Sequence, residues 1–193
     1  MMTDNNDKDA MDIVRFYRGE IPSWGDRWLK DIREYDDMRL EHAHDYIQWL
    51  FPIEEPRYFN RDTPKLSDEV IQEFHNDKSL RDKLEQSFID FLKFLGLEME
   101  KFSDGVVIVY KAPDYEDKKD RWQTGQNHNL LRITRVLHSL QYLGLRSHAM
   151  GFYIALMNFV KENPDGFNKI SLGYWKEAIL SYKSRQGNPP CLS

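Results

Sequence analysis

Cysteine is nearly absent from this sequence of 193 residues, with Cys191 as its single example. One cysteine can form neither an intramolecular disulfide nor a cysteine-based zinc cage. Long hydrophobic runs are lacking too, because the longest charge-free apolar run, Ala149–Val160, is far shorter than the ~20 residues of a bilayer crossing. Positive charge is not in excess: 27 Lys and Arg against 32 Asp and Glu give a formal net charge of −5. That balance argues against a general polyanion-coating protein, although a local basic stripe remains open.

The two ends show no sorting signal. Met1–Asp9 is acidic and lacks the basic and apolar regions of a secretory signal. Cys191 is the third residue from the end, whereas prenylation needs a cysteine in the fourth position. We therefore expect a cytoplasmic protein with a disordered acidic segment at 1–10, a single helical domain over 11–185 and a flexible tail at 186–193.

Helical periodicity dominates the chain and predicts a mainly α fold, a compact bundle of about six to eight helices. The expected helices span residues 12–18, 26–31, 41–51, 67–75, 79–95, 127–144, 147–161 and 171–183. Asp26, Ser67 and Ser171 are the expected N-caps of three of them. Leu97–Phe102 and Val106–Tyr110 alternate or are β-branched on either side of a Gly-containing turn, which predicts one short β-hairpin near 97–110. The charged stretch 112–125 is expected to be a loop.

The helix expected over 128–143 has the clearest division of faces. One side carries the large apolar residues Leu130, Ile133, Val136, Leu137, Leu140 and Leu143 and should be buried. The opposite side carries a stripe of His128, Arg132, Arg135 and Ser139. Two guanidinium groups near a helix start suit a phosphate or carboxylate. The stripe is equally consistent with a solvated polar face, or with arginines paired to nearby acids such as Asp114, Glu116 or Asp117.

Motifs for catalysis and metal binding are missing. His42 and His44 would lie roughly 200° apart on a helix, so they cannot share one ion. The sequence contains no Gly-x-Ser-x-Gly elbow, no Gly-rich phosphate loop and no dinucleotide fingerprint. We therefore predict no metal, no cofactor and no enzymatic activity.

Aromatic residues crowd the first sixty positions: Phe16, Tyr17, Trp24, Trp28, Tyr46, Trp49, Phe51, Tyr58 and Phe59. Large rings can anchor loop-rich segments to a helical body. They can also line a groove that accepts a peptide or a short amphipathic partner. The sequence leaves both interpretations open.

Three motifs occur in a distinctive order. The first is Phe-Tyr-Arg-Gly-Glu-Ile-Pro at 16–22, the second is Tyr-Ile-Gln-Trp-Leu-Phe-Pro at 46–52, and the third is His-Asn-Leu-Leu-Arg-Ile-Thr-Arg-Val-Leu at 128–137. Together they resemble the conserved region of the opioid growth factor receptor family, over roughly residues 12–185. Unlike the animal members, this sequence carries no C-terminal repeat array.

The resemblance implies a non-enzymatic domain that binds a peptide or protein segment, with receptor activity for an enkephalin-type peptide. It also implies peripheral membrane association and an association with the nucleus or its envelope. The candidate ligand-binding residues are taken from the matching motifs: His128, Asn129, Arg132, Arg135, Gln48 and Trp49. The alternative function is binding of a phosphate-bearing ligand, a nucleotide or RNA, through the His128, Arg132 and Arg135 stripe.

Overall fold

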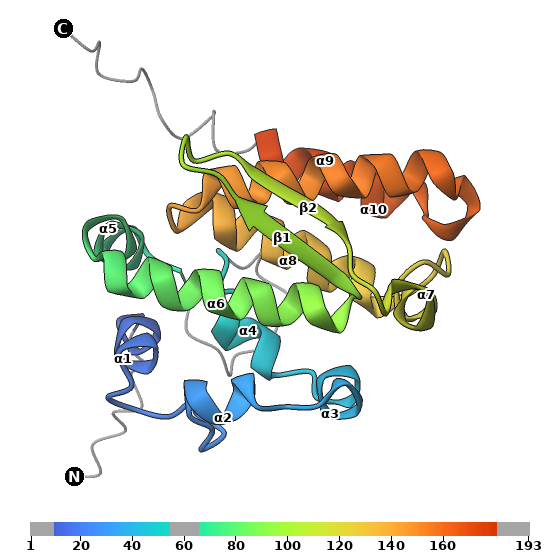
Figure 1. Ribbon diagram of the computed structural model, residues 1–193. Coiled ribbons are helices and arrows are strands. Elements are labelled where there is room, and N and C mark those ends of the chain that lie inside the picture. Colours follow the sequence, from blue (N-terminus) through green and yellow to red (C-terminus); the bar gives the residue numbers. More distant parts are fainter. Residues whose placement is uncertain (1–9, 55–65, 181–193) are drawn as a thin grey trace, which may run out of the picture. The chain divides into compact units, whose positions relative to one another are not determined.

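The structure, a computed structural model, describes residues 10–54 and 66–180 (Figure 1). These residues form ten α-helices, two 3-10 turns and one antiparallel hairpin, which confirms the mainly α prediction. The helices outnumber the expected six to eight because segments expected as one helix or as loop form short helices. The expected tail, Cys191 and all but one residue of the acidic segment lie outside the described residues. The contacts divide the chain into two compact units after Leu84, and a single domain over 11–185 stays a prediction.

The first unit contains five helices and the start of a sixth: α1 (Asp12–Arg18), α2 (Leu29–Arg33), α3 (Asp37–His42), α4 (Tyr46–Leu50), α5 (Asp68–Asn76) and α6 (Lys78–Phe94). Helix α1 ends as predicted at Gly19, which has φ 80°. The prediction of one helix over 41–51 is wrong, because extended backbone at Ala43 separates α3 from α4. Asp26 does not cap a helix. It has φ 55° in the turn before α2, a conformation that Asp tolerates better than most residues.

Aromatic rings fill the core of the first unit. Trp49 packs on Phe16 with ring centroids 5.1 Å apart and on Trp24 at 5.3 Å. Tyr17 meets Phe74 edge to face at 5.1 Å. Edge and tilted contacts of this kind stabilise a core beyond the area they bury. Most of the described aromatics of this group therefore anchor short helices to one another, whereas Tyr58 and Phe59 lie outside the described residues.

The second unit begins within α6 and contains the remaining elements: β1 (Leu97–Lys101), β2 (Val107–Lys111), α7 (Tyr115–Lys118), η1 (Lys119–Arg121), α8 (His128–Tyr142), α9 (Arg146–Glu162), η2 (Pro164–Gly166) and α10 (Lys169–Leu180). The predicted hairpin is confirmed, with Leu97 opposite Lys111 and Lys101 opposite Val107. The stretch 112–125 is not all loop, since it contains α7 and η1. Ser171 does not cap α10, because the Asn168 carboxamide accepts the Ser171 N–H at 2.8 Å and the helix starts earlier.

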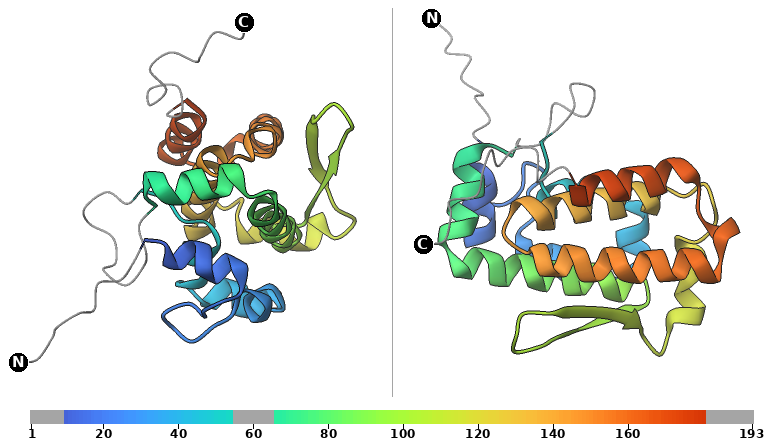
Figure 2. Two further views of the ribbon diagram at one scale, coloured as in Figure 1. Left: turned by 90° about the vertical axis from the view of Figure 1, so that its left-hand side faces the viewer. Right: turned by 90° about the horizontal axis from the view of Figure 1, so that it is seen from above.

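Helix α8 packs against α9 and α10, and strand β2 packs against α9 (Figure 2). Gly151 of α9 makes the approach of β2 possible. A Cβ atom at this position would lie 2.2 Å from the Val107 carbonyl oxygen. The close contact therefore depends on the missing side chain.

A charged cluster fixes the same hairpin from its other strand. Lys101 Nζ lies 3.0 Å from the Glu85 carboxylate, and His148 Nε2 lies 3.1 Å from it. The ring nitrogen of His148 approaches the carboxylate without meeting hydrogen-bond geometry. His148 and, less strongly, Lys101 lower the pKa of Glu85 to about 2. The ionised carboxylate thus holds together α6, β1 and α9.

Replacing Gly151 with alanine should destabilise the protein. Helix propensity alone would favour the alanine by ~0.5–1 kcal/mol, but overpacking against backbone typically costs ~1–3 kcal/mol. We expect G151A to lower the free energy of unfolding in urea titrations. The matched control is G173A in α10, where a Cβ meets nothing within 4 Å and where a gain is expected. Equal stability of the two variants would contradict the close approach.

Replacing Glu85 with glutamine should flatten the acid dependence of stability. A carboxyl group whose folded pKa is depressed stabilises the fold above its unfolded pKa of ~4.3, and this contribution is lost as the pH falls toward 2. At pH 7 we expect E85Q to lower the free energy of unfolding by about 2 kcal/mol. The gap to the wild type should close as the pH falls from ~5 toward 2.

Urea titrations across that pH range measure the effect of E85Q, and E98Q on the exposed face of β1 is the control. A gap between E85Q and wild type that stays constant with pH would show that the Glu85 carboxylate does not stabilise the fold through its charge.

Candidate functional site

The predicted stripe on α8 is not a solvated face. Arg132 is 5% exposed and Ser139 is fully buried, whereas Leu131 is more than half exposed. His128 is exposed and Arg135 is half-buried. The interpretation of the stripe as a solvated polar face is therefore wrong for Arg132. The apolar pattern alone cannot reveal this, since a buried arginine needs only a polar partner inside the fold.

Asn129 supplies such a partner. Its carboxamide oxygen accepts a hydrogen bond from Arg132 Nη1 at 3.0 Å, and its amide nitrogen donates to the Arg121 carbonyl at 2.9 Å. Two candidate residues are thus brought together, with the Asn129 side chain fully buried. This arrangement fastens the start of α8 to η1 and uses both ends of the carboxamide within the fold.

Two of the three acids considered as partners for the arginines pair with lysines. Asp114 pairs with Lys118 at 2.8 Å and Glu116 pairs with Lys119 at 2.6 Å. These hydrogen bonds lower the pKa of both carboxyl groups. Both pairs lie within α7 and its continuation.

The candidates on α4 belong to the core of the first unit. Trp49 is buried in the aromatic cluster. Gln48 is half-buried, and among the described residues no group donates a hydrogen bond to its buried Oε1 atom. Helix α4 also receives a hydrogen bond from outside, because the Tyr17 phenol donates to the Leu50 carbonyl oxygen. The motif at 46–52 therefore positions Tyr17.

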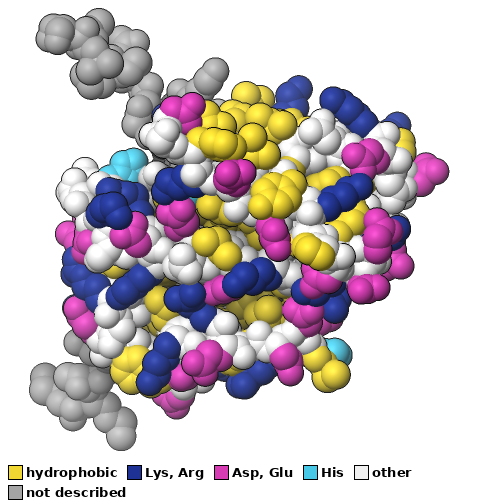
Figure 3. All heavy atoms as spheres, in the orientation of Figure 1, with side chains coloured by type: hydrophobic (Ala, Val, Ile, Leu, Met, Phe, Trp, Pro, Cys, Tyr) yellow, Lys and Arg dark blue, Asp and Glu magenta, His cyan; other side chains and the backbone are white. Residues whose placement is uncertain are grey.

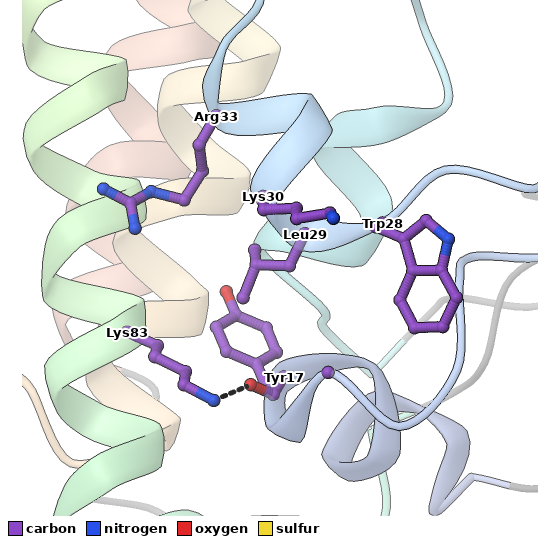
Figure 4. A pocket seen from close by; sticks show the side chains of 7 residues that line it. Tyr17, Trp28, Leu29, Lys30, Arg33 and Lys83 are labelled. Carbon is purple, nitrogen blue, oxygen red and sulfur yellow. Dashed lines mark hydrogen bonds between the residues drawn. The ribbon is translucent and has the colours of Figure 1, made fainter.

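Tyr17 lines a pocket of about 380 Å³ in the first unit (Figure 4). Pockets for small ligands usually have volumes of ~300–1,000 Å³. The other lining residues come from three segments: Gly19, Trp28, Leu29, Lys30, Arg33 and Lys83. Trp28 is 36% exposed, so part of its indole is available to a ligand.

The charged side chains that line the pocket are cationic, and among the described residues no carboxylate lines it. Lys83 Nζ donates to the Tyr17 carbonyl at 2.7 Å, which fixes the ammonium group beside α1. Lys30 is exposed and extends toward Trp28, while Arg33 extends away from it (Figure 4). An apolar floor beside ammonium groups fits a ligand that combines an apolar or aromatic side chain with a carboxylate or phosphate.

Sequence reasoning missed this pocket. Lys30 and Arg33 are three residues apart in α2 and therefore share a side of the helix. That spacing was a local signal for a cationic surface. Nothing local connects Lys83 with Tyr17, since 66 residues separate them. Where the structure describes the chain, no group of three His, Cys, Asp or Glu side chains could hold a metal ion.

The chain is similar to a known family over most of its length. Residues 5–187 match the family described as the opioid growth factor receptor conserved region. No solved structure matches the chain. Among the described residues, no helix combines the length and the hydropathy that crossing a membrane requires.

Curated relatives agree with that match. The mouse (Mus musculus) opioid growth factor receptor is 33% identical over 76% of this chain and 23% of its own length. The human (Homo sapiens) receptor is 31% identical over 90% of this chain and 26% of its own length. Opioid growth factor receptor-like protein 1 of Xenopus tropicalis is 34% identical over 68% of this chain and 25% of its own length. The chain thus spans about a quarter of each of these relatives.

Proposed function

The chain belongs to the opioid growth factor receptor family, and from this premise we propose that it is a non-enzymatic binding module for a short peptide. The ligand is of the enkephalin type, with aromatic side chains and a terminal carboxylate. It binds in the pocket lined by Tyr17, Trp28, Leu29, Lys30 and Lys83. The observation that carries this proposal is an apolar pocket whose lining, within the described part of the chain, contains ammonium groups and no carboxylate.

The chemistry of the pocket favours the C-terminal end of a peptide, which carries a carboxylate, over an internal segment. An aromatic side chain of the peptide packs on the indole of Trp28, which is 36% exposed, beside the buried Leu29. The terminal carboxylate meets Lys30 at the exposed side of the pocket, where one ion pair is worth up to ~1 kcal/mol. Lys83 donates to the Tyr17 carbonyl, which fixes a second positive charge beside the pocket.

The motif residues have a supporting role in this proposal. Trp49 holds the aromatic core, and Leu50 receives the Tyr17 phenol. Asn129 and Arg132 stabilise the second unit. The phosphate or RNA alternative loses support, since it requires the Arg132 guanidinium to reach solution and that side chain is buried. His128, Arg135 and Gln48 stay candidates for contacts with a larger protein partner.

The cellular setting follows from the same kinship and belongs to the proposal. We propose a cytoplasmic module that associates peripherally with membranes or with the nuclear envelope through its partners. The family names of the relatives support a receptor role of this kind.

Titration with a labelled enkephalin-type pentapeptide tests the proposed function. We expect saturable binding by fluorescence anisotropy, and about fivefold weaker binding of the C-terminally amidated peptide, because amidation removes the carboxylate. Lys30→Glu should weaken binding of the free-acid peptide by at least that factor and should leave binding of the amidated peptide nearly unchanged. Trp28→Ser should weaken both peptides.

The matched control is Lys176→Glu, an exposed lysine on α10 with the same change of charge. It should bind both peptides as the wild type does. Absence of saturable binding up to millimolar peptide would overturn the proposed ligand. Saturable binding that Lys30→Glu and Trp28→Ser leave unchanged would place the site elsewhere.

A further inference from the structure

The outer face of the β-hairpin carries large apolar side chains without a covering element. On the inner face Leu97, Val107 and Val109 are buried. On the outer face Phe102, Val106, Ile108 and Tyr110 are each 41–49% exposed. Strands alternate their side chains between faces, so these four outer residues form one row along β2 and the adjoining turn. We call them the apolar row.

Two glutamates border the apolar row. Glu98 is paired with Tyr110 and Glu100 with Ile108, and directly opposite residues point to the same face. Within residues 10–54 and 66–180, neither glutamate forms an ion pair. The two lysines of the hairpin are already engaged: Lys101 with Glu85 at 3.0 Å and Lys111 with Glu162 at 2.7 Å. The outer face therefore presents uncompensated negative charge beside apolar surface.

Helix α9 extends the apolar surface. Met150 and Ile154 flank the Gly151 contact with β2 and are 42% and 55% exposed. At ~100° per residue, both lie on one flank of the helix. In Figure 3 hydrophobic side chains gather over the hairpin and α9, with acidic side chains among them. Monomeric proteins rarely expose contiguous apolar patches larger than a few hundred Å², and larger ones mark interaction sites.

We propose that this face docks a basic amphipathic helix of another protein, its apolar stripe on the apolar row and its Lys or Arg side chains over Glu98 and Glu100. A helix ~10 Å wide covers the row together with the α9 flank, and places its own flanking residues above the neighbouring strand. An extended segment, spaced ~4.8 Å from a neighbour, would cover a single row.

The charge pattern selects against two other occupants. A second copy of this chain related by a twofold axis presents the same patch, so the glutamates of one copy face those of the other. Anionic lipid headgroups would likewise meet carboxylates. A cationic partner gains from these two charges in both the rate and the specificity of binding.

A pair of synthetic helical peptides tests the proposal. Both have a leucine stripe, flanked by lysines in one and by glutamates in the other. We expect the full chain to bind the lysine peptide in low salt and not the glutamate peptide. E98Q/E100Q should weaken binding of the lysine peptide about three- to tenfold. I108S/Y110S should weaken the same binding by tenfold or more. Circular dichroism melting checks that each variant is folded.

The matched controls lie in the first unit: E20Q/E34Q for exposed acids and M38S for an exposed apolar side chain. Binding lost equally in E20Q/E34Q would mean non-specific attraction and would overturn the proposal. Concentration-dependent dimerisation abolished by I108S/Y110S would assign the face to a second copy, and flotation with phosphatidylcholine or phosphatidylserine vesicles would assign it to a membrane. Each of these outcomes would also overturn it.

Discussion

The first unit depends on one residue, Tyr17. Its phenol donates to the Leu50 carbonyl at the end of α4, its ring packs on Phe74 of α5, and its own carbonyl accepts from Lys83 of α6. Helices of five to nine residues are too short to be stable alone in water. A buried residue that contacts three other elements, two through its side chain and one through its carbonyl, supplies the missing tertiary stabilisation. Tyr17 also lines the pocket, together with residues in and beside α2 and with Lys83 of α6.

The second unit gains its tertiary stabilisation from longer helices and from buried hydrogen bonds between its elements. Trp175 donates to the Leu130 carbonyl at 3.1 Å, and Trp122 donates to the Leu95 carbonyl at 3.0 Å. Asn129 joins η1 to Arg132. A buried polar atom without a partner costs ~1–3 kcal/mol, so such links also specify which turn of each helix meets its neighbour. The conspicuous third motif is explained largely by this role.

Local chemistry made much of the fold predictable. Ser67 caps α5, Asn127 caps α8, and Gly105 has the positive φ that the hairpin turn requires. Two helix boundaries differ from the prediction. Extended backbone at Ala43 separates α3 from α4, and α10 starts early because the Asn168 carboxamide accepts the Ser171 N–H. The site was less predictable than the fold. Arg132 looked like a ligand contact on a helical wheel, because a wheel cannot show that its partner Asn129 is itself bound to the Arg121 carbonyl of another element.

The net charge of −5 is the sum over the whole chain, and two local surfaces have opposite signs. The described residues that line the pocket of the first unit include cations and no carboxylate, whereas the hairpin face of the second unit presents two glutamates whose neighbouring lysines are engaged. Screening confines exposed charges to a range of ~8–10 Å, so a ligand responds to the local sign and not to the sum. An acidic protein can therefore select a carboxylate at one place and a cationic helix at another. Kinship with a receptor family fits a module with two binding surfaces, since one surface can hold a small ligand while the other recruits a protein.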